Sequence, residues 1–392
     1  MGTVLDSIDF ALDEMPGEEL HDVLRAYREE RGPVAATHFL GLPAFVISSH
    51  EALLDAFRDV ERFPPHLMYE LSFEGAVGRS FISMGDAKEH LVYRKLATPA
   101  FRSRALQRFE AEGLAPLASE LVDDLGDDAE VDLVEGFSAR LPYLVISRML
   151  GLPRERESEF HGWAKAQLAF RDDPVAAEKA KAELTNCLAP VVEARRSEPR
   201  DDVISELVAA EVDGRSLSDE EIHSHVRLLF PTGGETTYGS LGNLLFALLC
   251  HEGEWERLAR DPSRIDAAVE EALRWETPIA VLPRRSGSQP ARFRGVDIPA
   301  DSWVLFAIAG ANRDPAVFDD PDSFRIGRDT SDALTFGRGV KSCPGLHLAR
   351  RSMATSLRVL LERMPQLELL DGEAAIPRRS VLRSPAALRV RR

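Results

Sequence analysis

Cysteine is scarce in this chain, and basic side chains are outnumbered by acidic ones. Three cysteines among 392 residues, far apart and odd in number, fit neither a disulfide framework nor a zinc motif. Cys187 and Cys250 lie in apolar helical stretches, so we expect reduced cysteines in the core there. Cys343 lies in a different context, described below.

The shortage of positive charge excludes one class of partner. With 48 Lys and Arg against 65 Asp and Glu, the formal net charge is −17, and such a field opposes binding to nucleic acid. Hydrophobic residues at 44% and charged residues at 29% are typical of a globular protein. No repeat or flexible linker interrupts the chain, so we predict one domain over residues 1–392.

Long hydrophobic runs are also absent from the sequence. Residues 1–20 have no basic leader, and acids interrupt their only apolar stretch. We therefore expect neither a signal peptide nor a membrane anchor. The predicted location is the cytoplasm.

Apolar periodicity predicts a mainly α protein with small β-sheets. Strand signals are few, at residues 44–49, 291–298, from 302 onward and at the C-terminus. Helical patterns are more frequent. They cover residues 50–58, 88–97, 104–126, 136–150, 155–170, 174–197, 200–210, 219–251, 264–275 and 345–363.

The longest predicted helix contains a defect at its midpoint. It begins after Ser218 with a capping box and runs to about His251, roughly 50 Å at 1.5 Å per residue. Within LLFPTGGETT, Pro231 removes a backbone donor, and the two glycines that follow remove side chains. This pattern indicates either a proline bend in a core helix or a bulky group lying against the glycines, beside Glu235 and Thr236.

A glycine-rich loop precedes Cys343 in TFGRGVKSCPGLHLARRS, and an amphipathic helix follows it. Pro344 suits a first helical position, so the sulfur is expected to face the positive end of that helix as a thiolate. Such a sulfur is a metal ligand or a nucleophile. Glycines in the loop allow close approach of a flat cofactor, which Phe336 would shield.

The run FGRGVKSCPGLHLA resembles the haem-binding signature of the cytochrome P450 family, F-G-x-G-x-H/R-x-C-x-G-x-x-L-A. The resemblance implies an α-rich triangular prism, with haem b between the long central helix and the helix after the cysteine, and Cys343 as the iron ligand. Lys341 departs from the usual histidine or arginine and lacks the planar geometry of arginine. The signature residues expected to contact the haem are Phe336, Gly337, Gly339, Lys341, Cys343, Gly345 and Ala349.

Further motifs of the family follow in the expected order. VEEALRW resembles its E-x-x-R pair, which gives Glu271 and Arg274, with Arg328 as the third member of a buried structural network. The spacing of four between His90 and Arg94 puts both on one helical face, and the resemblance makes them contacts of a haem propionate. Without the resemblance, each of these sets is an ordinary polar helix surface.

A further propionate contact is expected in the segment before residue 296. Counting back from the strand at residues 296–299 in the family pattern selects Arg285. Arg284 is a close competitor.

TGGETT resembles the distal motif of the family, A/G-G-x-D/E-T-T. This assigns Glu235 and Thr236 as the distal acid and alcohol, and Gly233 leaves room for haem and oxygen. The implied enzyme is a haem-thiolate monooxygenase that inserts one atom of O2 by hydroxylation or epoxidation, with secondary metabolism as one setting. Thr236 would hydrogen-bond the bound oxygen and Glu235 would relay protons.

The resemblance implies electrons from a separate ferredoxin or flavodoxin with an NAD(P)H-dependent reductase, because the chain has no flavin, nicotinamide or iron–sulfur motif. Arg338, Lys341, Arg350 and Arg351 surround the cysteine loop. They would form a docking patch for an acidic carrier, or equally propionate contacts and ordinary helix surface.

Apolar residues at the positions where the family binds its substrate suggest a lipid-like, terpenoid or polyketide-like molecule, although each of them suits a protein core equally well. Neither the substrate nor the oligomeric state follows from the sequence. The expected substrate contacts are Leu67, Met68, Phe73, Phe230, Ile279, Val281 and Leu282.

Three other functions compete with the monooxygenase. A peroxide-using relative would replace the acid–alcohol pair, which is intact here, and a non-catalytic haem-binding protein would not need that pair. A cysteine hydrolase would need a histidine beside Cys343. His347, four residues on, is expected on the helix surface instead.

Overall fold

The structure is a computed structural model and describes residues 5–98, 101, 104–370 and 372–392. Most of these residues are helical, as the apolar periodicity predicts. The α-helices are α2 (Glu18–Ala26), α3 (His50–Arg58), α4 (His66–Tyr69), α5 (Gly75–Val77), α6 (Ala87–Ala97), α7 (Arg104–Arg108), α8 (Leu114–Asp124), α9 (Leu141–Met149), α10 (Glu157–Leu168), α11 (Pro174–Ser197), α12 (Val203–Ala209), α13 (Asp219–Leu229), α14 (Glu235–Cys250), α15 (Glu254–Arg260), α16 (Ile265–Trp275), α17 (Ile308–Asn312) and α18 (Leu346–Arg363).

Within the residues that the structure describes in full, short helical turns of other kinds connect several of these helices. Five are π-helical: Tyr27–Arg31, Glu70–Glu74, Phe109–Gly113, Val134–Ser138 and Phe230–Gly234. Four are 3₁₀-helical: Phe81–Ser83, Arg154–Arg156, Pro262–Arg264 and Gly339–Lys341.

The strands form small sheets at the periphery. The largest has the order β1-β2-β9-β6, in which β2 and β9 are parallel and the other pairs are antiparallel. The prediction of a mainly α fold with small sheets is therefore confirmed. The strands are β1 (Val34–Phe39), β2 (Leu42–Ile47), β3 (Glu130–Asp132), β4 (Glu211–Val212), β5 (Arg215–Ser216), β6 (Leu282–Arg285), β7 (Ala291–Phe293), β8 (Val296–Ile298), β9 (Trp303–Phe306), β10 (Glu368–Leu369) and β11 (Arg389–Arg391).

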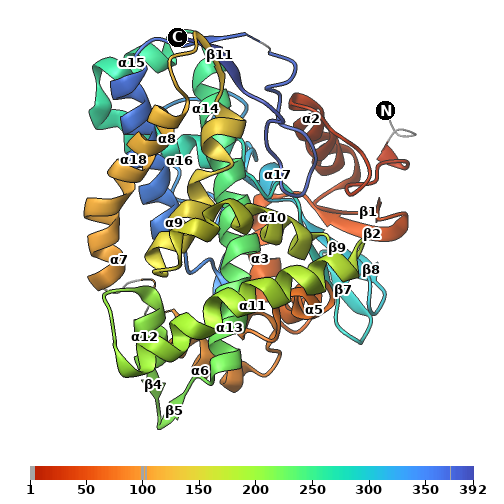
Figure 1. Cartoon of the computed structure of the whole chain (residues 1–392). Helices are drawn as coiled ribbons and strands as arrows, with labels where there is room; N and C mark the ends of the chain where they lie inside the picture. The colour runs from red at the N-terminus through yellow and green to blue at the C-terminus, as the bar shows by residue number, and fades with distance from the viewer. Residues whose placement is uncertain (1–4, 99–100, 102–103, 371) are drawn as a thin grey trace.

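The long central helix crosses the molecule as α13 and α14 (Figure 1). It begins with the predicted capping box, in which the Ser218 side chain accepts from the Glu221 backbone and the Glu221 side chain accepts from the Ser218 backbone. Between the two helices, Phe230–Gly234 forms a π-helical turn. The midpoint defect is therefore a local widening, of the kind that often marks a functional site.

Two apolar cores lie on either side of this helix. One joins α8, α9, α14, α16 and α18, and the other joins α10, α11 and α13. Cys187 is buried in the second core, but Cys250 is exposed at the end of α14, so the expectation of a core position was wrong for Cys250. Among the described residues, no helix has the length and the apolar character needed to cross a membrane.

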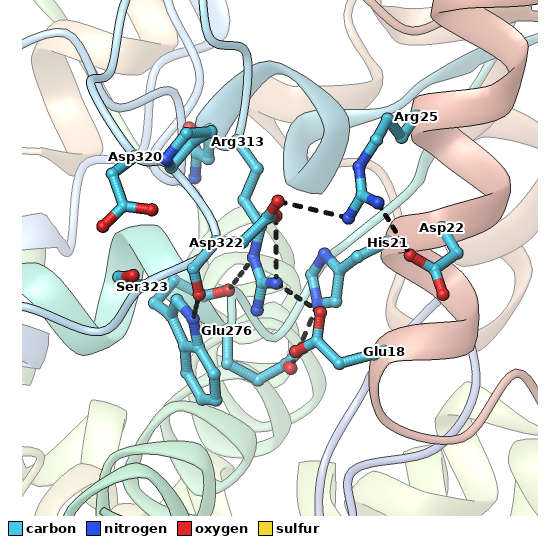
Figure 2. A network of polar contacts seen from close by, with 12 residues as sticks. Glu18, His21, Asp22, Arg25, Glu276, Arg313, Asp320, Asp322 and Ser323 are labelled. Atoms are coloured by element: carbon cyan, nitrogen blue, oxygen red, sulfur yellow. Dashed lines mark hydrogen bonds and ion pairs between the residues drawn. The ribbon is translucent and has the colours of Figure 1, made fainter.

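Buried ion pairs join α16 to the segment that follows α17. The Arg274 guanidinium donates to both oxygens of Glu271, at 2.8 and 2.7 Å, and Arg328 Nε donates to Glu271 at 3.2 Å. The structure thus brings the predicted network together. A second network joins α2 to the end of α16, where His21 lies 3.2 Å from Glu276 (Figure 2).

Candidate functional site

A cavity of about 670 Å³ lies between the widened turn of the central helix and the loop before α18. Cys343 lines it, together with residues of the central helix, α4, β6, β9 and the loop after α16. The lining is mostly apolar, as in a binding site for a small organic molecule. The predicted iron ligand and the predicted distal motif therefore face one common space.

Cys343 is positioned by the loop that precedes it. Its backbone N–H donates to the Phe336 carbonyl at 3.0 Å, and its side chain faces the cavity. Burial raises the pKa of the Cys343 thiol, and the Gly345 backbone and the charges of Arg94 and Arg350 oppose this effect only in part. The expectation that the helix end alone favours a thiolate was wrong, because α18 begins at residue 346, beyond Pro344. Metal binding would supply the missing stabilisation.

Missing side chains make room for a flat group beside the sulfur. A Cβ at Gly345 would meet only Cys343 Sγ, at 4.0 Å, and one at Gly233 would meet only Ile146, at 3.5 Å. Phe336, Gly337, Lys341 and Ala349 also line the cavity, as predicted. Gly339 is not in the wall, but its φ of +78° shapes the loop, and a Cβ there would lie 2.9 Å from a carbonyl oxygen of α3.

Lys341 and Arg284 are two of the four cations that the described residues place on the cavity wall, and the charge of Arg284 acts on Lys341. Lys341 Nζ donates to the carbonyls of Phe81 and Ile82 at 2.6 and 2.9 Å, and more weakly to that of Met84. Burial, with the nearby charges of two arginines, lowers the pKa of Lys341 to about 7. Arg284 is the second cation, and neither it nor Lys341 forms an ion pair with a carboxylate of the described chain. Such a cluster is suited to the carboxylates of a bound ligand.

His90 and Arg94 lie behind this wall and do not form part of it. Arg94 donates to the carbonyls of Val340 and Ser342 in the cysteine loop, at 3.2 and 2.8 Å. Burial and the charges of Lys341 and Arg94 lower the pKa of His90 to about 4, and its Nε2 is buried without a hydrogen-bond partner. This nitrogen is therefore available for a hydrogen bond to a bound ligand.

Arg284, and not Arg285, faces the cavity. The two residues are neighbours in β6, where successive side chains point to opposite faces. Arg284 lies over the ring of Tyr69 and lines the cavity. Arg285 packs over the ring of Trp303 and does not line the cavity. The position expected for Arg285 is therefore occupied by its competitor.

The distal motif divides between two faces of the central helix. Thr236 lines the cavity, and its hydroxyl donates to the Thr232 carbonyl at 2.7 Å. Thr232 also lines the cavity and donates to the Leu228 carbonyl at 2.6 Å. Glu235 is absent from the wall and instead accepts a hydrogen bond from Tyr143. No motif in the sequence points to Tyr143, which lies 92 residues before Glu235.

Four of the seven expected substrate contacts line the cavity: Met68, Phe73, Ile279 and Leu282. The other three do not. Phe230 stacks on Phe160 of α10, Val281 is fully buried in the core beside the sheet, and Leu67 is in α4 but outside the wall. The wall also includes two charged residues that the sequence did not indicate, Arg171 and Asp172 after α10.

The residues present suit haem. The sulfur, the glycine cradle, the cation cluster and the unpartnered His90 nitrogen match an iron ligand, a flat ring and two propionates. His347 is exposed on α18, as expected for a surface residue and not for the base of a hydrolase.

Comparisons with known proteins lead to the same family. A family model described as Cytochrome P450 matches residues 264–377. The 6-deoxyerythronolide B hydroxylase of Saccharopolyspora erythraea is 34% identical over 391 residues, covering 94% of this chain and 96% of that protein. The polyketide biosynthesis cytochrome P450 PksS of Bacillus subtilis is 33% identical over 285 residues, covering 72% of this chain and 70% of that protein.

The fold is shared over nearly the full length. The solved structure of cytochrome P450 CYP109Q5 from Chondromyces apiculatus covers 99% of this chain and 98% of its own, with a TM-score of 0.87 and 30% identity. The chain therefore belongs to the cytochrome P450 family, and it is a haem-binding monooxygenase.

Proposed function

We propose that this enzyme hydroxylates or epoxidises an apolar polyketide-like molecule, with Cys343 as the iron ligand. The observation that carries the proposal is the single cavity into which both Cys343 and Thr236 face. Its mostly apolar wall suits a large apolar substrate. The names of two relatives refer to 6-deoxyerythronolide B and to polyketide biosynthesis, which supports this substrate class.

The residues that line the cavity would bind the haem and shield it from water. When bound, the haem would supply the oxidation chemistry, and a Cys343 thiolate as iron ligand would favour it. Lys341 and Arg284 would pair with its propionates, with His90 and Arg94 as further donors behind them. Glycines 233, 337 and 345 would let the backbone approach the ring.

On the distal side, Thr236 would donate its hydroxyl proton to a group in the cavity, exchanging its present bond to the Thr232 carbonyl. Glu235 would carry protons to that hydroxyl. This general-acid role requires Glu235 to turn inward, because its carboxylate lies off the cavity wall.

A separate ferredoxin or flavodoxin with its reductase would supply the electrons. A cytoplasmic location and a single domain over residues 1–392 also stay predictions. Three of the four cations predicted to form a docking patch already have partners within the protein. Arg350 pairs with Glu270 at 2.5 Å, Lys341 is committed to backbone carbonyls, and Arg338 donates to the Ser331 carbonyl at 2.9 Å. Arg351 is the best remaining candidate for contact with an acidic carrier.

The test is the absorption spectrum of the dithionite-reduced protein with carbon monoxide, for wild type and Cys343→Ser. A Soret band at the long wavelength typical of thiolate-ligated haem, lost in the variant, is expected. Absence of haem, or a band that the substitution leaves unchanged, would refute the ligand assignment.

The substrate class is tested separately by ligand-induced shifts of the ferric Soret band. We expect 6-deoxyerythronolide B to shift the band at lower concentration than testosterone or a long-chain fatty acid. If the fatty acid binds most tightly, the cavity recognises a carboxylate and the polyketide proposal fails.

A further inference from the structure

Three side chains meet outside the cavity, on the outer face of the widened turn. The carboxylate of Glu235 in α14 accepts a hydrogen bond from the Tyr143 hydroxyl of α9. His161 Nε2, from α10, lies 3.6 Å from the same Glu235 oxygen, Oε1. The Tyr143 and His161 rings stack with centroids 4.6 Å apart and an interplanar angle of 21°. Three different helices therefore contribute to one polar cluster.

The backbone of the widened turn makes this meeting possible. A Cβ at Gly234 would lie 2.3 Å from the Tyr143 ring, so any other residue there would displace the tyrosine. Exposure rises outward through the cluster: Tyr143 is 1% exposed, the Glu235 side chain 10% and the His161 side chain 28%. The cluster thus leads from the buried side of the distal motif to solvent.

We propose that His161 is the proton donor that loads Glu235, and that Tyr143 is a positioning residue that holds the carboxylate in its outer, loading position. This rests on the proposed function of Glu235 as the proton carrier to Thr236. His161 is a suitable donor because an imidazole exchanges protons near neutral pH and its edge here reaches solvent.

The proton transfer balances without any change of oxidation state. An imidazolium at His161 gives its Nε2 proton to Glu235 Oε1, which leaves a neutral imidazole and a neutral carboxyl group. The carboxyl group turns toward the cavity and gives the proton to the Thr236 hydroxyl as that hydroxyl passes its own proton inward. The carboxylate then returns to Tyr143. Because Nε2 is buried, the His161 ring turns to bring this vacant nitrogen to solvent, takes a new proton there from water, and turns back as the imidazolium.

The groups around Glu235 keep its carboxylate ionised between proton transfers. The titratable groups that face it are Tyr143 from α9, His161 and Lys165 from α10, and Tyr238 from its own helix. Burial alone would raise the pKa of Glu235, but the partners His161 and Tyr143, with the charge of Lys165, outweigh burial and lower it. Lys165 acts on Glu235 only through its charge, whereas His161 Nε2 approaches the carboxylate oxygen directly, so the histidine is the partner placed to transfer a proton.

The variants separate a proton donor from a structural contact. His161→Gln removes the titrating ring, Tyr143→Phe removes only the hydroxyl, and Glu235→Gln removes the acceptor. Two matched controls are used. His38→Gln replaces a partly buried histidine of β1. Tyr238→Phe removes a hydroxyl that contacts a backbone carbonyl and not Glu235. Each protein is first reduced with dithionite, and its absorption spectrum is recorded with carbon monoxide. A retained thiolate-type band shows that the proposed haem site is intact, whereas its loss in wild type would refute the proposed function itself.

The first readout is ¹³C NMR of histidine-labelled, haem-loaded protein in the diamagnetic CO-bound form, with the His161 signal assigned by its loss in His161→Gln. Because a carboxylate stabilises a neighbouring cation, Glu235→Gln is expected to move the titration of that signal toward acid pH, and Tyr238→Phe is expected to leave it in place. If the titration of the His161 signal is the same in Glu235→Gln and in wild type, the proposal is overturned.

The second readout is oxygen consumption driven by NADPH, a plant-type ferredoxin and its reductase, with released peroxide measured against pH. In wild type, the fraction of electrons lost as peroxide should rise as pH increases through the range where histidine deprotonates. His161→Gln should show a high, flat peroxide fraction and a roughly tenfold slower formation of water at pH 7. Tyr143→Phe should keep the pH dependence at a lower rate. A wild-type profile in His161→Gln would overturn the proposal.

Discussion

Substitution of Glu276 by glutamine tests how strongly the buried network of Figure 2 holds the N-terminal segment to the centre of the molecule. Glu276 is 2% exposed at the end of α16. It accepts from Arg383 Nε at 2.6 Å and lies 3.2 Å from His21 Nε2. Arg313, which donates to Glu18 at 2.7 Å, adds further positive charge nearby.

The pKa of Glu276 gives the size of the effect. Burial alone would raise this pKa, but the charge of Arg383 and the hydrogen bond from His21 outweigh burial and lower it from 4.5 to about 2. That difference corresponds to roughly 3 kcal/mol of folding free energy at neutral pH. Removal of one partner from a buried ion pair typically costs about 3–5 kcal/mol, because the other charge stays buried. Glu276→Gln should therefore lower the folding equilibrium constant by about a hundredfold or more.

The sign with pH follows from the lowered pKa. The stability that Glu276 contributes is complete above pH 4.5 and is lost as pH falls toward 2, because the unfolded chain binds the proton first. The difference between wild type and Glu276→Gln should be largest at pH 7 and should shrink below pH 4.5.

Urea unfolding followed by circular dichroism, at pH 7 and at pH 4, measures both effects. The control is Glu368→Gln, which removes a surface pair with Arg391 in which Glu368 is 67% exposed. It should change the folding free energy by at most about 0.5 kcal/mol. Equal urea midpoints for Glu276→Gln and the control at pH 7 would refute the reasoning.

Three further substitutions test other parts of the structure. Arg284→Gln should weaken haem retention during gel filtration more than Arg285→Gln, because Arg284 faces the cavity; the reverse order would place the propionate elsewhere. Gly339→Ala should destabilise the protein by about 1–3 kcal/mol, given its φ of +78° and the close carbonyl, and thermal melts should show no such loss for Gly162→Ala, which has open space. Trp255→Phe leaves a buried carbonyl without its 3.0 Å hydrogen bond and should cost about 1–3 kcal/mol in the same melts, with an unchanged melting temperature as the contradicting result.

Local signals in the sequence predicted much of the fold. Helices α3 and α11 have the predicted bounds, and Ser218 caps the central helix as expected, because caps and apolar periodicity act within a few residues. Helix α2 and strand β1 were not predicted; β1 pairs with β2, and α2 contacts the distant Glu276 through His21. Exposure of Cys250 was also missed, since an apolar run does not reveal where a helix leaves the core.

The errors within the site have two geometric causes. In a strand, a shift of one residue exchanges the two faces, so counting along the chain could not separate Arg284 from Arg285. In the central helix, a local defect was expected, but the direction in which it turns each side chain was not; Phe230 lies in the π-helical turn and packs against Phe160 of α10. Neither effect is visible in the composition of the motif.

The same turn explains why neighbouring residues of one motif serve different sides of the helix. Consecutive side chains on a helix diverge by about 100°, and here Thr236 lines the cavity whereas Glu235 lies outside its wall and contacts Tyr143. The carboxylate then needs partners of its own, and Tyr143 can approach closely because position 234 has no side chain. The distal site therefore has an inner half, where Thr236 lines the cavity, and an outer half, where Glu235 contacts Tyr143. The sequence motif identifies the inner half, whereas the outer half depends on side chains from α9 and α10 that only the folded chain brings together.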